Sequence, residues 1–426
     1  MRLRATRLTA ISHAIRRMDK SVFAGASAAY SLRIPAGSTY SGPVVRVRRS
    51  SDNAEADVPV AGNQVAKNRT FATTADWSLG AGVTISGGAM NCAGGVTFIA
   101  GQNMGLVNGR VYNMTFVVNK TGATADATIR VTTGASTTVE GPLAALLAAN
   151  PANGLQVWRA LFTATGPCLC FASHNNVFNG SISFISIQEK SPSGADERWL
   201  DEYALLGFVG TGNGFITTWY DQSGNARHAV QATAASQPRI VNAGVLETKN
   251  SRPSIRAHTV STYLSAFKFA APSTAWTLGV VASRDTAGSN TNDSYGTDGG
   301  GYNADGFYMQ LGNTGPLPLF NRPGASTSCL TAGSVGSGVA IIASVTHTTA
   351  NVAQAFLNGA SGAATAPMTW TTGQFSDFRI GVYPVSTTVN LLGTYSEHIS
   401  FSTDLSTTVR QSIERSQGTA FGITVA

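Results

Sequence analysis

The sequence predicts an all-β protein that folds as two β-sandwich domains, one inserted into the other, with a short helix at each end of the chain. The chain has 426 residues, which is enough for more than one hydrophobic core. It contains 46 Gly and only 12% charged residues, a composition typical of short strands joined by tight turns. Several runs also alternate apolar and polar residues between Gly or Asn turns, as half-buried strands do.

Residues 1–24 predict a basic docking helix. Most of the net charge of +7 lies in this segment, so the rest of the chain is nearly neutral. Four apolar residues recur at steps of three and four and would form one stripe of a helix: Leu8, Ile11, Ile15 and Met18. The continuous apolar stretch of a secretory signal is missing. A solvated basic tail is the alternative, because so short a helix is marginal unless it packs on a partner.

The body of the chain is unsuited to two classes of partner. Binding to nucleic acid rests on many contacts from clustered Lys and Arg, and the nearly neutral body lacks such clusters. No apolar run approaches the ~20 residues of a membrane-spanning helix. We therefore expect a soluble protein with no nucleic-acid partner and no membrane insertion.

Residues 61–191 predict the inserted domain. Its runs alternate as half-buried strands should, and the clearest case is Gly180–Gln188, where Ile182, Phe184 or Ile185, and Ile187 are available to a core face. The other domain would comprise residues 25–60 and 192–426. After a turn-rich linker, 198–209 has helical spacing and leads into the strand that ends at Trp219. The last helix would begin after Ser406, which can cap it, and end at Gly418.

The four cysteines predict buried, reduced thiols. Cys92, Cys168, Cys170 and Cys329 are too few and too unevenly placed for a disulfide framework. Cys168 and Cys170 have the spacing that points two strand side chains to one face, but no His or second Cys pair completes a metal set. Reduced thiols are consistent with assembly in a cytoplasm. We expect no metal and no cofactor, and calcium, although possible, has no support.

Two parts of the chain resemble known families. The insert, with Phe71, Trp77 and the closing Gly180–Gln188 strand, resembles the jelly-roll carbohydrate-binding modules of bacterial glycosidases and phage tail proteins. The remaining segments resemble a concanavalin-like (laminin-G-like) sandwich. Within that group they resemble the catalytic domain of arabinofuranosidase B and, equally, its non-catalytic copies in phage virion proteins, through Ala29-Tyr-Ser-Leu-Arg, Tyr40-Ser-Gly-Pro, Arg46-Val-Arg-Arg-Ser-Ser-Asp, Trp219-Tyr-Asp-Gln-Ser-Gly-Asn and Gln231-Ala-Thr-Ala.

The resemblance implies two catalytic carboxyl groups, and both positions look lost. A retaining glycosidase needs such a pair about 5 to 5.5 Å apart. Where the family has its nucleophilic Glu, this chain reads Asn292-Asp-Ser-Tyr-Gly-Thr-Asp, without a Glu. Where the family has its acid, the turn Gly381-Val-Tyr-Pro-Val contains none. Asp298 or Asp305 could substitute, but the expectation is that the chain is not an enzyme.

Two sets of residues are candidates for binding. Trp219, Tyr220, Asp221, Gln222 and Asn225 could form a sugar or calcium site, although a tight turn with a core Trp explains them more simply. His228 is expected to be structural as well. A Gly-rich loop is the better candidate for a glycan, because its acidic, amide and aromatic side chains suit sugar hydroxyls and rings: Asp293, Tyr295, Asp298, Tyr302, Asn303 and Asp305.

These observations predict a structural or adhesion protein of a tailed phage particle: a tail fibre, spike or capsid-surface component. The N-terminal helix would dock on other virion proteins, the protein would form a homo-oligomer in the virion, and its sandwiches could bind a host surface glycan in multiple copies. The main alternative is an arabinofuranosidase-like glycoside hydrolase. A third interpretation is an assembly protein without affinity for glycans.

Overall fold

The computed structural model describes residues 22–94, 97–121, 129–137, 144–145, 153–173, 178–190, 197–259, 261–266, 275–285, 292–297, 306–312, 315–322, 325–328, 336–365, 367, 377–381 and 392–426. It confirms the all-β sandwich fold, with antiparallel pairing throughout the described sheets. The predicted N-terminal helix, with Leu8, Ile11, Ile15 and Met18, lies outside the described residues, so it stays a prediction. No helix in the described part of the chain has the length and apolar character needed to cross a bilayer.

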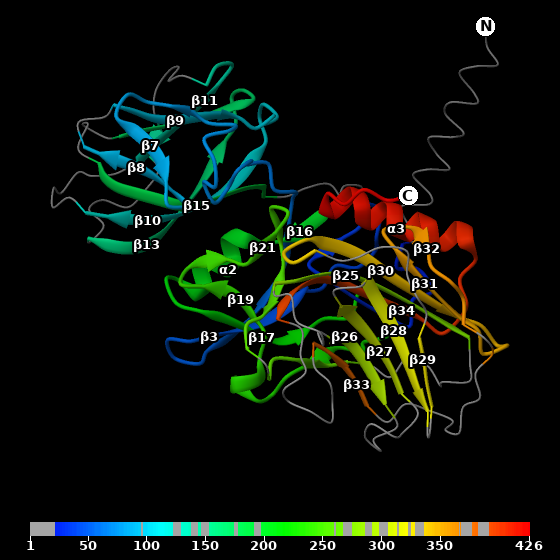
Figure 1. The fold of residues 1–426 in the computed structure, drawn as a ribbon. Helices are drawn as coiled ribbons and strands as arrows, with labels where there is room; N and C mark the ends of the chain where they lie inside the picture. The colour runs from blue at the N-terminus through cyan, green and yellow to red at the C-terminus, as the bar shows by residue number, and fades with distance from the viewer. Residues whose placement is uncertain are drawn as a thin grey trace, which may run out of the picture.

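The strands of the insert form two five-stranded sheets (Figure 1). Among the described residues, these strands pair only with one another, as an inserted domain would require, while the boundaries at residues 61 and 191 stay a prediction. One sheet has the order β13 (Gly154–Thr163), β10 (Val111–Lys120), β15 (Asn179–Glu189), β8 (Ala89–Ala93), β7 (Val83–Ser86). The other has the order β12 (Ala144–Ala145), β11 (Ile129–Gly134), β14 (Cys168–Ser173), β9 (Phe98–Asn103), β6 (Ser78–Leu79).

A register shift explains which residues of β15 reach a core. Between Val117 and Val118 of β10 the partner strand carries one extra residue, Ser183, so the alternation of side chains restarts there. Ile182 and Ile185 therefore share the face towards the core of the insert, and Phe184, on the opposite face, is buried in the core of the larger sandwich. The sequence left Phe184 and Ile185 as alternatives.

The larger sandwich joins the two ends of the described chain. Strand β34 (Gly393–Phe401) lies between β1 (Ala28–Ser31) and β25 (Trp276–Arg284). The other main strands are β3 (Val45–Arg49), β4 (Glu55–Val58), β17 (Gly214–Trp219), β18 (Ala229–Val230), β19 (Arg239–Asn242), β20 (Val245–Leu246), β23 (Ile255–Ala257), β24 (Leu264–Ser265), β26 (Asn292–Thr297), β27 (Gly306–Gly312), β28 (Gly315–Arg322), β29 (Ala325–Ser328), β30 (Ala340–His347), β31 (Ala353–Leu357), β32 (Ala360–Ser361) and β33 (Asp377–Ile380).

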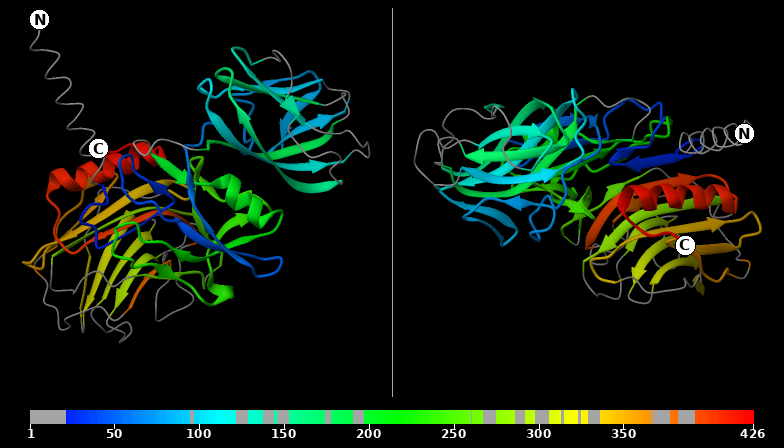
Figure 2. Two further views of the ribbon diagram at one scale, coloured as in Figure 1. Left: turned by 180° about the vertical axis from the view of Figure 1, so that it is seen from behind. Right: turned by 90° about the horizontal axis from the view of Figure 1, so that it is seen from above.

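Short elements complete the molecule. Strands β2 (Arg33–Ile34), β16 (Arg198–Leu200) and β5 (Val60–Ala61) form a three-stranded sheet at the point where the chain enters and leaves the insert. Strands β21 (Thr248–Lys249) and β22 (Arg252–Pro253) pair as a two-stranded ribbon, and η2 (Ala234–Ser236) is a single 3₁₀ turn. Figure 2 shows the insert and the larger sandwich as two lobes, with helix α3 (Thr407–Phe421) on the outside of the larger one.

The predicted helix over 198–209 is wrong in its first part. Residues 198–200 form strand β16, because Trp199 and Leu200 pair with β2 and β5. The helix α2 (Glu202–Val209) starts only after Asp201, whose side chain accepts a hydrogen bond from the Ala204 amide at 2.9 Å and so caps it.

The predicted end of the last helix is also wrong. Helix α3 continues to Phe421 and stops at Gly422, which has a left-handed backbone with φ of 64°. Gly418 serves another purpose, because a Cβ there would lie 2.6 Å from the Ile423 carbonyl oxygen. Its lack of a side chain lets the C-terminal segment fold back against the helix. Ser406 occupies the capping position, but its side chain makes no capping hydrogen bond.

Helix α2 fills the junction between the lobes. It packs on the outer face of β10, β13 and β15, and the insert contributes Val117 and Phe184 to the same core cluster as Leu205 and Leu206 of the helix. Gln188 of β15 donates to the Leu200 carbonyl at 3.0 Å and accepts from the Glu202 amide at 2.9 Å. The lobes are thus joined by a buried interface as well as by the chain.

Three of the cysteines are buried, as predicted: Cys92, Cys168 and Cys170. The thiols of Cys168 and Cys170 approach neighbouring carbonyl oxygens of one segment, those of Ala135 and Ser136. Burial raises the pKa of Cys92 to about 12. Cys329 lies outside the described residues.

Candidate functional site

The predicted glycan loop is only partly described. Asp298, Tyr302, Asn303 and Asp305 lie outside the described residues. Asp293 and Tyr295 belong to β26, which lies between β27 and β33. Tyr295 stands opposite Tyr308 on one side and Arg379 on the other. The role of these residues in binding a glycan stays a prediction.

The strand register brings together the two segments to which the resemblance assigns catalytic acids. Ser294 of β26 pairs with Ile380 of β33, immediately before the turn that begins at Gly381. At the other end of the same pairing, Thr297 stands opposite Asp377. Asp377 is thus a carboxylate-bearing residue on the strand next to the one that leads to Asp298. The sequence pattern did not single out Asp377, because the resemblance places the family's acid in the turn after β33 and not on the strand itself.

The Trp219–Asn225 segment lies against the first strand of the chain. Trp219 ends β17, is fully buried, and has its ring centroid 5.8 Å from that of Tyr30 on β1. The Tyr30 hydroxyl donates to the Arg227 carbonyl at 2.6 Å. The Trp219 ring therefore belongs to the core of the sandwich.

Asp221 uses both of its carboxylate oxygens within the protein. Oδ1 accepts from the amides of Ala29 at 2.8 Å and Ser223 at 2.9 Å. Oδ2 accepts from the Ser223 hydroxyl at 2.8 Å and the Arg227 amide at 3.0 Å. Four donors on a buried carboxylate form a tight turn fastened to β1, a geometry that leaves little room for a cation.

Asn225 and His228 make further hydrogen bonds that hold the segment in place beside β1. Asn225 Nδ2 donates to the carbonyls of Ala26 at 3.0 Å and Ser27 at 3.2 Å. His228 Nδ1 accepts from the Asp221 amide at 3.1 Å, and its ring packs edge-on to that of Tyr220.

Tyr220 faces the opposite way, towards the edge of the sheet. Its hydroxyl donates to Asp57 Oδ1 at 2.7 Å. Burial, with the carboxylate of Asp57 beside the hydroxyl, raises the pKa of Tyr220 to about 12. The phenol is therefore a neutral hydrogen-bond donor at physiological pH.

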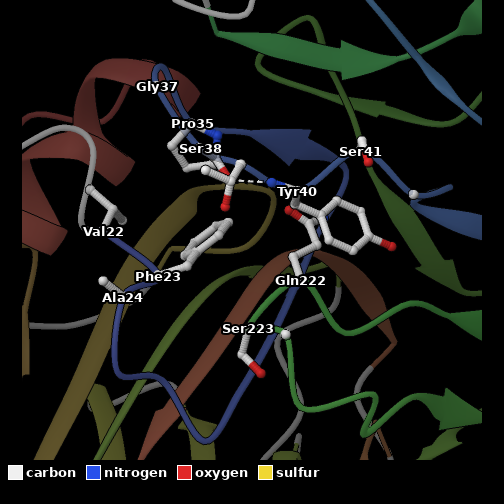
Figure 3. Close-up of a pocket in the computed structure, with 13 residues that line it drawn as sticks. Val22, Phe23, Ala24, Pro35, Gly37, Ser38, Tyr40, Ser41, Gln222 and Ser223 are labelled. Atoms are coloured by element: carbon white, nitrogen blue, oxygen red, sulfur yellow. Dashed lines mark hydrogen bonds between the residues drawn. The ribbon is translucent and has the colours of Figure 1, made fainter.

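A cleft of about 440 Å³ opens beside this segment (Figure 3). We call it the Tyr40 cleft. Its wall is formed by three stretches of chain, which are residues 22–24, 35–42 and 222–224. Figure 3 shows Gln222 between Tyr40 and Ser223, with the Phe23 ring on the other side of the view. None of the described residues that line the cleft is charged.

Comparison with known proteins shows similarity of fold. No family model and no curated protein matches the chain. Among solved structures, a GH54 α-L-arabinofuranosidase is similar at 13% identity with a TM-score of 0.47, covering 94% of this chain and 64% of its own. An arabinofuranosidase complexed with arabinofuranosyl-α-1,2-xylobiose is similar at 16% identity and a TM-score of 0.39, over 54% of this chain and 56% of its own. A Trypanosoma rangeli sialidase is similar at 12% identity and a TM-score of 0.35, over 62% of this chain and 49% of its own.

These comparisons correct one expectation and leave another without support. The comparison contradicts the prediction that the chain is not an enzyme, because the similar solved structures are glycoside hydrolases. That expectation rested on the missing acid in two short segments, and Asp377 on β33 lies outside both of them. A phage origin has no support in the comparisons, and docking on virion proteins, homo-oligomer formation and location in a virion stay predictions.

Proposed function

We propose that this protein acts on a carbohydrate by hydrolysing a glycosidic bond, with an arabinofuranoside as the first candidate substrate. The observation that carries the proposal is the position of Asp377 opposite Thr297, the residue that precedes Asp298 in the sequence. Asp377 thus lies on the strand next to the segment that contains Asp298. The resemblance to the arabinofuranosidase B catalytic domain implies one catalytic acid in that segment and the other in the turn after β33, at the opposite end of the strand from Asp377.

Strand pairing brings one of these positions next to the segment that holds the other. Asp377 and Thr297 are an opposed pair, whose Cα atoms lie up to about 5.5 Å apart in an antiparallel ladder, and Asp298 is the next residue after Thr297 in the sequence. A retaining glycosidase needs two carboxyl groups about 5 to 5.5 Å apart, and an inverting one needs them about 6.5 to 9.5 Å apart.

The roles of the two carboxyl groups follow from this chemistry. One protonates the leaving oxygen of the glycosidic bond as a general acid, and the other attacks the sugar or activates a water as a general base. Asp305 is a further candidate for either role. The neighbouring Tyr295 and Tyr308, which stand opposite each other, are suited to the apolar face of a sugar ring.

The test is release of 4-nitrophenolate by the full-length chain from a panel of 4-nitrophenyl glycosides that includes the α-L-arabinofuranoside. We expect release from at least one glycoside, and a fall of about 10²-fold or more in Asp298→Asn or Asp377→Asn, the usual effect of removing an acid or base group. Asp76→Asn is the matched control, because Asp76 is exposed in a turn of the insert with φ of 69°, a conformation that Asn adopts readily.

Two results would contradict the proposal. One is the absence of hydrolysis across the panel by protein that is folded and stable. The other is hydrolysis that survives both Asp298→Asn and Asp377→Asn, which would place the chemistry elsewhere and leave Asp305→Asn as the next variant to assay.

A further inference from the structure

We propose that the Tyr40 cleft is a binding site for a neutral saccharide, separate from the β26–β33 strand pair. This inference goes beyond hydrolysis, since it concerns binding alone and uses none of the carboxyl groups named above. The volume of the Tyr40 cleft, about 440 Å³, falls in the range of small-molecule pockets, about 300 to 1,000 Å³.

Buried contacts hold each wall of the cleft in place. Phe23 packs in a core cluster with Ile399, Phe401 and Ile413. Arg198 Nη2 donates to the carbonyl oxygens of Ser38 at 3.3 Å and Tyr40 at 2.9 Å. The walls are thus fastened to the sheets before any ligand arrives, and a preformed site avoids the cost of ordering loops on binding.

Tyr40 has a fixed ring and an occupied hydroxyl. The hydroxyl donates to the Pro43 carbonyl at 2.6 Å, and burial raises the pKa of Tyr40 to about 12. The phenol therefore stays neutral and committed to the backbone. What Tyr40 offers a ligand is its flat, half-buried ring, the kind of surface on which the apolar face of a sugar packs.

Gln222 supplies the polar group that points to a ligand. The residue is only 5% exposed, and its backbone amide donates to the Ala29 carbonyl at 2.8 Å. Side-chain Nε2 donates to the Ser31 carbonyl at 2.6 Å. Because that partner can only accept, the orientation of the amide is determined by chemistry rather than by the similar shapes of N and O.

This orientation leaves Gln222 Oε1, a buried atom, as an acceptor without a donor among the described residues. A buried acceptor without a partner costs free energy, and the residue that carries it lines the cleft. A hydroxyl donor from a ligand would satisfy it. Among the described lining residues, the other polar side chains are hydroxyl groups, those of Ser38, Thr39, Tyr40, Ser41 and Ser223.

The lining defines the chemical class of the ligand. The hydroxyl groups of Thr39 and Ser41, together with one amide oxygen, suit a molecule that both donates and accepts hydrogen bonds. Phe23, Pro35 and Tyr40 suit one with an apolar face. The absence of charge among the described lining residues disfavours anions, which would lose their hydration without gaining a cationic partner. A neutral pentose or hexose unit meets all three conditions.

The experiment is ligand-observed NMR and calorimetric titration of the full chain with L-arabinose, D-xylose and xylobiose, with D-glucuronate as the charged comparison. We expect the neutral sugars to bind and glucuronate to bind more weakly. Ser41→Trp, at an exposed position of the wall, should weaken binding by about tenfold or more, because the indole takes the ligand's place in the cleft. Ser361→Trp is the matched control, because Ser361 is exposed on β32 and contributes nothing to the cleft.

A second variant tests the amide. Gln222→Leu should also weaken binding, and because it breaks the bond to Ser31 its folding must be checked by circular dichroism. Ser41→Trp alone decides the outcome if Gln222→Leu does not fold. No binding of any neutral sugar, or equal binding by Ser41→Trp and Ser361→Trp, would overturn the inference. Binding that depends on Ser41 in a protein without hydrolase activity would overturn only the proposed hydrolysis.

Discussion

At the scale of single residues, a buried histidine in the larger sandwich links the stability of the fold to pH. His398 lies on β34, is 1% exposed, and has the rings of Tyr30 and Phe378 within about 6 Å of its own. Burial lowers the pKa of His398 to about 3, because a protonated imidazole would lose its hydration. The folded state therefore keeps this side chain neutral at a pH where the unfolded chain protonates it.

This difference predicts how stability depends on pH. Between the unfolded pKa of about 6.5 and the folded value, the unfolded state binds more protons, so the free energy of unfolding falls as the pH is lowered, by about 1 kcal/mol per pH unit from this group. His398→Phe removes that contribution and should flatten the profile. Denaturation midpoints at three pH values between 7 and 4 measure it. If the free energy of unfolding falls equally with decreasing pH in the unchanged protein and in His398→Phe, then His398 does not cause the loss of stability at low pH.

At the scale of elements, the Trp219–Asn225 segment fastens the end of β17 to β1, and β1 in turn pairs with β34. The two fastened segments are separated by the whole insert, so no local propensity specifies their contact. Asp221 is the centre of this connection, with its four hydrogen bonds.

Asp221→Asn tests whether the segment is a scaffold. Either orientation of the new amide leaves one pair of donors without an acceptor, so we expect a loss of about 1 to 3 kcal/mol of stability, read as a lower melting temperature. Asp76→Asn, exposed and outside this network, should leave the melting temperature unchanged. A stable Asp221→Asn protein that loses affinity for sugars would instead make Asp221 a ligand-binding residue.

At the scale of the whole molecule, a buried ion pair joins the two lobes. Arg69, in the chain before β6, binds Glu202 at the start of α2, and both side chains are at most 2% exposed. Arg69 also donates to the Ile185 carbonyl at 3.1 Å, and its guanidinium lies 4.8 Å from the centre of the Phe184 ring. The pair therefore lies where α2, β15 and the start of the insert meet.

Replacing only one partner of this pair should be costly, because it leaves the other partner buried without an opposite charge. Glu202→Gln leaves a buried guanidinium without its partner and should cost about 3 to 5 kcal/mol, whereas adding Arg69→Met to Glu202→Gln should cost less than the two single changes together. Calorimetry of the three variants measures this. Asp57→Asn, which breaks the exposed Arg46–Asp57 pair, is the control and should cost under about 1 kcal/mol. Additive effects at Arg69 and Glu202 would show that the pair does not couple the lobes.

The sequence by itself determined the all-β class, most strand positions, and the burial of Trp219 and of the described cysteines, because alternation and turn residues act over a few neighbouring positions. It left open which of Phe184 and Ile185 faces the core of the insert, because a one-residue register shift decides that. Only the tertiary structure placed Asp377 opposite Thr297 and closed the Tyr40 cleft around Gln222. Both sites join residues more than 75 positions apart, and such contacts depend on strand pairing and packing, which no local pattern encodes.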